Sequence, residues 1–106
     1  MKGFLKMAKT KWYLPRVYIS GPMSGYKDLN FPAFFEAERA LKARGFKVVN
    51  PARNRKCKDW KGYLKKDIAK LVKCQYIHLL PRWMHSRGAS LEWRIARELN
   101  IEEVKL

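Results

Sequence analysis

The sequence is poor in cysteine and histidine, and this shortage limits the metal sites that it can form. Two cysteines, Cys57 and Cys74, and two histidines, His78 and His85, stand isolated in the 106 residues. A structural zinc site needs such ligands in closely spaced pairs, which are missing here. We therefore expect no metal and no other cofactor, reduced cysteines, and structural roles for both histidines.

Long apolar runs are also absent. No stretch reaches the roughly 18 apolar residues that indicate a membrane-spanning helix, and lysines interrupt the N-terminal segment where a secretory signal would lie. We therefore expect a cytoplasmic protein with no membrane partner. The length predicts one domain, over residues 15–106, preceded by a basic extension over residues 1–14.

Acidic residues are few in comparison with basic ones. The chain has 9 Asp and Glu residues against 24 Lys and Arg residues, which gives a formal net charge of +15. Such a field attracts anions, including nucleotides and nucleic acids. Nucleic-acid binding, with Trp60, Tyr63 and Trp83 available for base stacking, is one hypothesis. The alternative is that surface lysines only maintain solubility.

Predicted strands and helices alternate along the chain. Short apolar runs at residues 16–20, 46–49 and 76–80 indicate strands, and Val104 indicates a short final strand. Asn30 and Asp59 are expected to cap the intervening helices, and Gly45 to end the first of them. This order predicts an α/β fold with a parallel sheet of four to five strands, whose ligand edge lies at the carboxyl ends of the strands.

Glu92 is an acidic residue on an apolar helix face. It precedes Ile95, Ala96 and Leu99 by three, four and seven residues, in a helix expected from about residue 89 to residue 99. A carboxylate that is partly desolvated there, and stabilised by the positive helix end, is a usable nucleophile. The alternative is that Glu92 only complements the charge of the helix N-terminus.

Asp67 presents the same pattern in the preceding helix. Leu64 and Leu71 flank it three and four residues away, beside an expected buried stripe. The alternative is a surface ion pair with Lys66 or Lys70. Two carboxyl groups that border one cavity can act as nucleophile and general acid at an anomeric carbon. The buried stripe is expected to consist of Trp60, Leu64, Ile68 and Leu71.

The loops at the predicted ligand edge are rich in glycine and serine. Gly21 and Gly25 permit a close approach of the backbone to a ligand, although tight turns explain them equally well. The hydroxyl groups of nearby serines and the amide of Gly88 are suited to hydrogen bonds with ribose or phosphate. The serines in question are Ser20, Ser24 and Ser86.

Several short motifs follow one another in a recognisable order. They are Val17–Gly25, Asn30-Phe31-Pro32, Asn50-Pro51-Ala52, Tyr63–Asp67, and the segment from Leu80 to Glu92. The set closely resembles a family of small phage and bacterial proteins that is similar to nucleoside 2-deoxyribosyltransferases and 2′-deoxynucleoside 5′-phosphate N-hydrolases. The resemblance covers roughly residues 16–104, and Arg82 departs from it because glycine is frequent at that position.

This resemblance implies a flavodoxin-like (Rossmann-like) three-layer fold and assigns roles to individual residues. Glu92 would be the nucleophile and Asp67 its acidic partner, and Ser86 and Gly88 would hold a 5′-phosphate. A homodimer is also expected, because a neighbouring subunit often completes the pocket in the relatives. The remaining residues expected to contact substrate are Tyr18, Ser20, Gly21, Met23, Gly25 and Asn50.

The function expected from these observations is cleavage of an N-glycosidic bond, or deoxyribosyl transfer, on a nucleoside or nucleotide. Two alternatives stay open at this point. The same residues suit a protein that binds nucleotides without turning them over, and the net charge suits a protein that binds nucleic acid.

Overall fold

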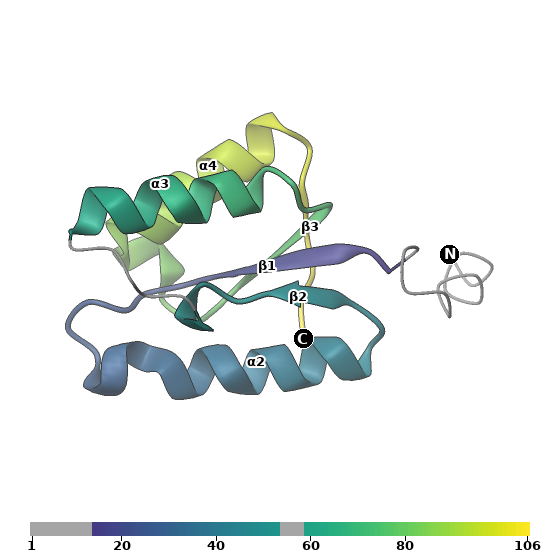
Figure 1. Ribbon diagram of the computed structural model, residues 1–106, viewed down its shortest axis with the longest axis horizontal. Helices are drawn as coiled ribbons and strands as arrows, with labels where there is room; N and C mark the ends of the chain where they lie inside the picture. Colours follow the sequence, from purple (N-terminus) through teal and green to yellow (C-terminus); the bar gives the residue numbers. More distant parts are fainter. Residues whose placement is uncertain (1–13, 54–58) are drawn as a thin grey trace.

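The computed structural model describes residues 14–53 and 59–106. Within them lies an α/β fold with a small parallel sheet and three α-helices (Figure 1). The expected basic extension lies outside the described residues except for Leu14, and so does Cys57. The elements are β1 (Arg16–Ser20), η2 (Lys27–Asn30), α2 (Phe31–Ala43), β2 (Lys47–Val49), η3 (Pro51–Arg53), α3 (Trp60–Leu71), β3 (Tyr76–Leu79), η4 (Trp83–His85), α4 (Arg87–Glu98) and β4 (Glu102–Glu103).

The described strands form one parallel sheet in the order β2-β1-β3-β4. Helix α2 covers one face of this sheet, and α3 and α4 cover the other, so the fold has three layers (Figure 1). This is a flavodoxin-like arrangement, as expected. The chain passes to β2 on one side of β1 and to β3 on the other. In such sheets the loops diverge at this switch point and leave a crevice at the carboxyl ends of the strands.

Strand β1 lies between the two helical layers and contributes to both cores. Val17 and Ile19 pack in the cluster that contains the buried residues of α2, whereas Tyr18 packs with Leu71 of α3 and Ala96 of α4. Successive strand residues point to opposite faces, so Ser20 lies on the same face as Tyr18. The sequence of β1 therefore directs two hydroxyl groups toward the layer that contains α4.

Helix α2 ends as expected but begins differently. Gly45 has a φ of +96°, and its N–H donates to the Lys42 carbonyl in the turn that ends the helix. Asn30 stands at the N-cap position, yet its side chain does not cap the helix. Its amide instead donates to the Pro22 carbonyl at 2.9 Å. The expected cap is wrong because this side chain fastens the loop after β1.

Helices α3 and α4 differ from expectation in three respects: the exposure of Trp60, the start of α4 and the position of Leu99. Asp59 caps α3 as predicted, by accepting from the Gly62 N–H, but Trp60 is 40% exposed and is no core residue. Helix α4 begins before residue 89 because Ser86 caps it by accepting from the Ala89 N–H. Leu99 lies beyond the end of α4 and is 52% exposed, so it is not part of the buried face.

The C-terminal end of the chain completes the sheet. Strand β4 ends before Val104, whose N–H donates to the Ile77 carbonyl at 2.8 Å. The Nδ1 atom of buried His78 lies 2.8 Å from the Val104 carbonyl, in agreement with a structural role. Burial raises the pKa of the Cys74 thiol to about 11, so that this thiol stays protonated at neutral pH.

The α-helices of the described residues are 12 or 13 residues long. None in residues 14–53 and 59–106 has both the length and the apolar character that crossing a bilayer requires.

Arg82 adopts a backbone conformation that favours glycine, with a φ of +65° in the turn after β3. We expect Arg82→Gly to raise the free energy of unfolding by about 0.5–1 kcal/mol, because relief of left-handed strain outweighs the added entropy of the unfolded chain. Urea unfolding followed by circular dichroism measures the change. The control is Arg94→Gly within α4, which should lower stability by about 1 kcal/mol. A less stable Arg82→Gly protein would contradict the prediction.

Candidate functional site

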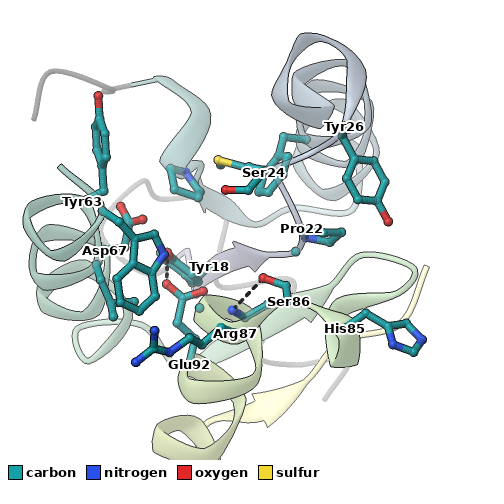
Figure 2. Close-up of a pocket in the computed structure, with 18 residues that line it drawn as sticks. Tyr18, Pro22, Ser24, Tyr26, Tyr63, Asp67, His85, Ser86, Arg87 and Glu92 are labelled. Atoms are coloured by element: carbon teal, nitrogen blue, oxygen red, sulfur yellow. Dashed lines mark hydrogen bonds between the residues drawn. The ribbon is translucent and has the colours of Figure 1, made fainter. Parts of the chain in front are cut away.

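A pocket with a volume of about 350 Å³ lies at the carboxyl ends of β1 and β3, as the strand order predicts. Its walls come from the loop after β1, Pro51, one face of α3, and the start of α4 (Figure 2). The structure brings together most of the residues that the sequence indicated. Those lining the pocket are Tyr18, Gly21, Met23, Ser24, Asp67, Ser86, Gly88 and Glu92.

The Glu92 carboxylate is the most deeply buried acidic group of the pocket, with 5% of the residue exposed. The Tyr18 hydroxyl donates to its Oε2 atom at 2.7 Å, and the Ser20 hydroxyl donates to its Oε1 atom at 2.6 Å (Figure 2 shows the first of these bonds). Such short distances are typical of hydroxyl groups that donate to an ionised carboxylate. Two donors from one strand therefore hold both oxygens of Glu92.

Helix α4 carries Glu92 on its sheet-facing side. Ala89 and Ala96 are buried three residues before and four residues after it, and their small side chains let the helix approach the sheet closely. Because the helix begins at Arg87, Glu92 lies in its second turn. The field of a helix end falls off within the first turn, so the predicted helix-dipole stabilisation is weak. The two β1 hydroxyls are the stabilising groups instead.

One face of α3 forms the wall of the pocket beside Glu92. Trp60, Tyr63, Leu64 and Asp67 all line it, at spacings of three, four and seven residues from Trp60. Asp67 therefore borders the same pocket as Glu92. A pocket wall and a buried stripe share this helical spacing, which is why the spacing alone predicts a core position for Trp60.

No sequence pattern indicated the basic side of the pocket. The Arg87 guanidinium lies over the Trp60 ring, 4.7 Å from its centroid, and so joins the first residues of α4 and α3 through a cation–π contact. His85 also lines the pocket, and Figure 2 places it on the opposite side from Asp67. The pocket thus combines two carboxyl groups with a guanidinium and an imidazole.

Different structural requirements favour glycine at the two glycine positions of the loop after β1. A Cβ atom on Gly21 would lie 2.7 Å from the Leu80 Cβ, so this glycine lets the loop pack against the end of β3. Gly25 has a φ of +83° and does not line the pocket. The tight-turn interpretation therefore accounts for Gly25, and packing against Leu80 accounts for Gly21, whereas close approach of the backbone to a ligand stays a prediction.

Asn50 lies after β2 as predicted, but it does not line the pocket. Its amide donates to Glu38 Oε1 at 3.2 Å, and its Oδ1 accepts from the Ala52 N–H at 2.9 Å. Arg53 also donates to Glu38 Oε1, at 2.8 Å. These contacts hold the turn Pro51–Arg53, and Pro51 in turn lines the pocket.

The buried Glu38 at the centre of this network is strongly perturbed. Hydrogen bonding from Arg53, assisted by Asn50 and Lys42, lowers the pKa of Glu38 from 4.5 to about 2, against the opposing effect of burial. Glu38 in turn raises the pKa of Arg53. No pattern in the sequence indicated this pair, because its members stand 15 residues apart on different elements.

Metal ligands do not gather in the described residues. Across residues 14–53 and 59–106, no three His, Cys, Asp or Glu side chains lie close enough to hold a metal ion.

Comparison with known proteins places the chain in a family. A family model described as a domain of unknown function, DUF4406, matches residues 15–105. No curated protein matches the sequence. The matched residues include every described strand and helix and all of the side chains that line the pocket. The chain therefore belongs to the DUF4406 family, a family of unknown function.

Proposed function

We propose that this protein cleaves the N-glycosidic bond of a nucleoside or nucleotide, with Glu92 as the nucleophile. The observation that carries the proposal is the buried Glu92 carboxylate, held through both oxygens by the hydroxyls of Tyr18 and Ser20 in a pocket that Asp67 also borders. An oriented, poorly hydrated carboxylate with a second carboxyl group nearby is suited to substitution at an anomeric carbon.

The proposed reaction has two steps. In the first, a Glu92 oxygen forms a bond to C1′ while the bond from C1′ to the base nitrogen breaks, and its electron pair leaves with the base. Protonated Asp67 supplies a proton to the departing base. In the second, Asp67 accepts a proton from water or from the N–H of another base as that molecule attacks C1′, and the electron pair of the C1′–O bond returns to Glu92. Water gives hydrolysis, and a second base gives transfer.

The size and lining of the pocket support a ligand of this class. A volume of about 350 Å³ lies near the lower end of the roughly 300–1,000 Å³ typical of small-molecule sites. Tyr26, Trp60 and Tyr63 offer aromatic rings to a base. The resemblance of the chain motifs to nucleoside 2-deoxyribosyltransferases and nucleotide N-hydrolases supports the same class of substrate.

A substrate panel tests the proposal directly. The full chain is incubated with the four common deoxynucleosides, their 5′-monophosphates and the matching ribonucleosides, and free base is measured by liquid chromatography. We expect release from at least one deoxy substrate. Addition of a second free base then separates transfer from hydrolysis. Absence of release from every member of the panel would refute the proposal.

A second candidate function is nucleotide binding without turnover. It is favoured by one observation, that both Glu92 oxygens already accept hydrogen bonds from within the protein. A carboxylate held in this way can also serve as a fixed acceptor for ribose hydroxyls. Micromolar binding of a nucleotide in calorimetry, with no base released over hours, would favour this candidate over catalysis.

The homodimer and nucleic-acid binding stay predictions. The exposed lysines of α3, Lys61, Lys65 and Lys66, are available to phosphates. Binding driven by such contacts weakens steeply as salt increases. Titration of single-stranded and duplex DNA at low and moderate salt tests this prediction, and sedimentation tests the dimer.

Trp60 is predicted to contribute to ligand affinity through stacking. We expect Trp60→Ala to weaken nucleotide binding about 10-fold or more, because stacking of a base on an aromatic ring contributes about 1–3 kcal/mol. Calorimetry on the nucleotide selected from the panel measures the effect. Trp60→Phe should retain most of the affinity, and Trp93→Phe, outside the pocket lining, should change little. Equal affinity in wild type and Trp60→Ala would contradict the prediction.

A further inference from the structure

We infer that Ser20 is a positioning residue that holds the Glu92 carboxylate in the orientation from which it attacks; this inference rests on the proposed function. Ser20 is 1% exposed, and its hydroxyl oxygen lies 2.6 Å from Glu92 Oε1. It does not line the pocket. Any effect of Ser20 on the reaction therefore passes through Glu92.

The two β1 hydroxyls act on different oxygens of one carboxylate. Tyr18 donates to Oε2 and Ser20 donates to Oε1. The terminal torsion of a glutamate is broad, so a single donor leaves the carboxylate plane more freedom to rotate than two donors do. A second donor two residues along the same strand removes that freedom.

The backbone around Ser20 makes this donor rigid. In the sheet, Ser20 pairs with Leu79, and its carbonyl accepts from the Leu80 N–H at 2.8 Å. The direction of the Ser20 side chain is therefore set by the central part of the sheet and not by a mobile loop. A rigid donor keeps its hydrogen bond to Glu92 without reorganisation during the reaction.

The chemistry of the second step also depends on this donor. When C1′ is released, the electron pair of the broken bond returns to Glu92 and its negative charge is restored. The Ser20 hydroxyl is already in place to donate to that charge. Loss of Ser20 should therefore lower kcat and leave KM nearly unchanged, because Ser20 does not border the space that the substrate occupies.

The kinetic test compares Ser20→Ala with Ser20→Cys on the substrate selected from the panel. We expect Ser20→Ala to lower kcat about 10- to 100-fold, in line with the loss of one hydrogen bond to a charged group. KM should stay within about twofold. Ser20→Cys keeps the side-chain volume but has only a weak donor, so it should also lower kcat. An unchanged kcat in Ser20→Ala, or full recovery of kcat by Ser20→Cys, would overturn the inference.

A second measurement needs no activity. The carboxyl carbons of ¹³C-labelled glutamate are followed by NMR across a pH titration, and the Glu92 signal is assigned by its loss in Glu92→Gln. In Ser20→Ala the Glu92 signal should change at higher pH than in wild type, because a donor to the ionised form is missing. An unchanged midpoint would overturn the inference even where base is released. A shifted midpoint in a protein that releases no base would support the contact and refute the proposed function.

Discussion

Replacing Glu92 with glutamine is expected to reduce base release by roughly 1,000-fold or more, because an amide cannot form the bond to C1′ that the proposed mechanism requires. Glutamine has nearly the same shape as glutamate. Hydroxyl groups can accept as well as donate, so those of Tyr18 and Ser20 can still pair with the new amide. We therefore expect the fold and the pocket to be retained, and the loss to appear in kcat.

The matched control for this variant lies on the same helix. Glu98 is exposed and does not line the pocket, so Glu98→Gln removes one negative charge from α4 without touching the site. It should release base at the wild-type rate. Calorimetry then separates catalysis from binding, because Glu92→Gln should still bind the nucleotide. Equal rates of base release in Glu92→Gln and wild type would show that Glu92 is not the nucleophile.

Of the proposed substitutions, the one that removes the Glu38 carboxylate is expected to lower the free energy of unfolding most. The pKa of Glu38 is about 2 in the folded protein, against 4.5 without its neighbours. Folding therefore favours the ionised form, and this contribution is complete above pH 4.5 and is lost as the pH falls through about 2. Because its partner Arg53 is largely exposed, we expect Glu38→Gln to lower the free energy of unfolding at neutral pH by only roughly 2 kcal/mol.

Urea unfolding at pH 7, 4 and 3 measures this effect. The difference in stability between wild type and Glu38→Gln should shrink as the pH falls below 4.5, because Glu38 of the unfolded wild-type chain takes up a proton there while Glu38 of the folded protein is still ionised. Glu36→Gln is the control, since Glu36 lies exposed on the same helix. Its stability should follow the wild-type values at each pH. A difference between wild type and Glu38→Gln that stays constant from pH 7 to pH 3 would contradict the prediction.

Much of the fold could be predicted because its signals are local. The apolar run of β1, the cap of α3 by Asp59 and the end of α2 at Gly45 each depend on residues within one turn or one strand. Strands and helices that alternate in this way have few ways to pack other than as a parallel sheet covered on both faces. A local signal gave a wrong prediction where one side chain had two available partners. Asn30 was expected to cap α2, but its amide donates to the Pro22 carbonyl instead.

The candidate site could be predicted less completely, because helical spacing does not distinguish a core from a pocket wall. Trp60 and Asp67 recur at the spacing of a buried stripe, and only the packing of α3 beside α4 decides that they face the pocket. Asn50 was correctly placed at the sheet edge. Its side chain nevertheless turns away from the ligand space because Glu38 and Ala52 offer it hydrogen bonds.

By itself, the sequence determined the strand and helix order, the edge of the sheet at which a ligand binds in such folds, and the presence of Glu92 on a sheet-facing helix surface. Only the tertiary structure decided which groups meet there. Tyr18 and Ser20 stand 74 and 72 residues from Glu92, and their hydroxyls reach its two oxygens because β1 lies beneath α4. The physical reason is that hydrogen bonds of a buried carboxylate depend on distances of a few tenths of an ångström, which arise from packing and not from local spacing.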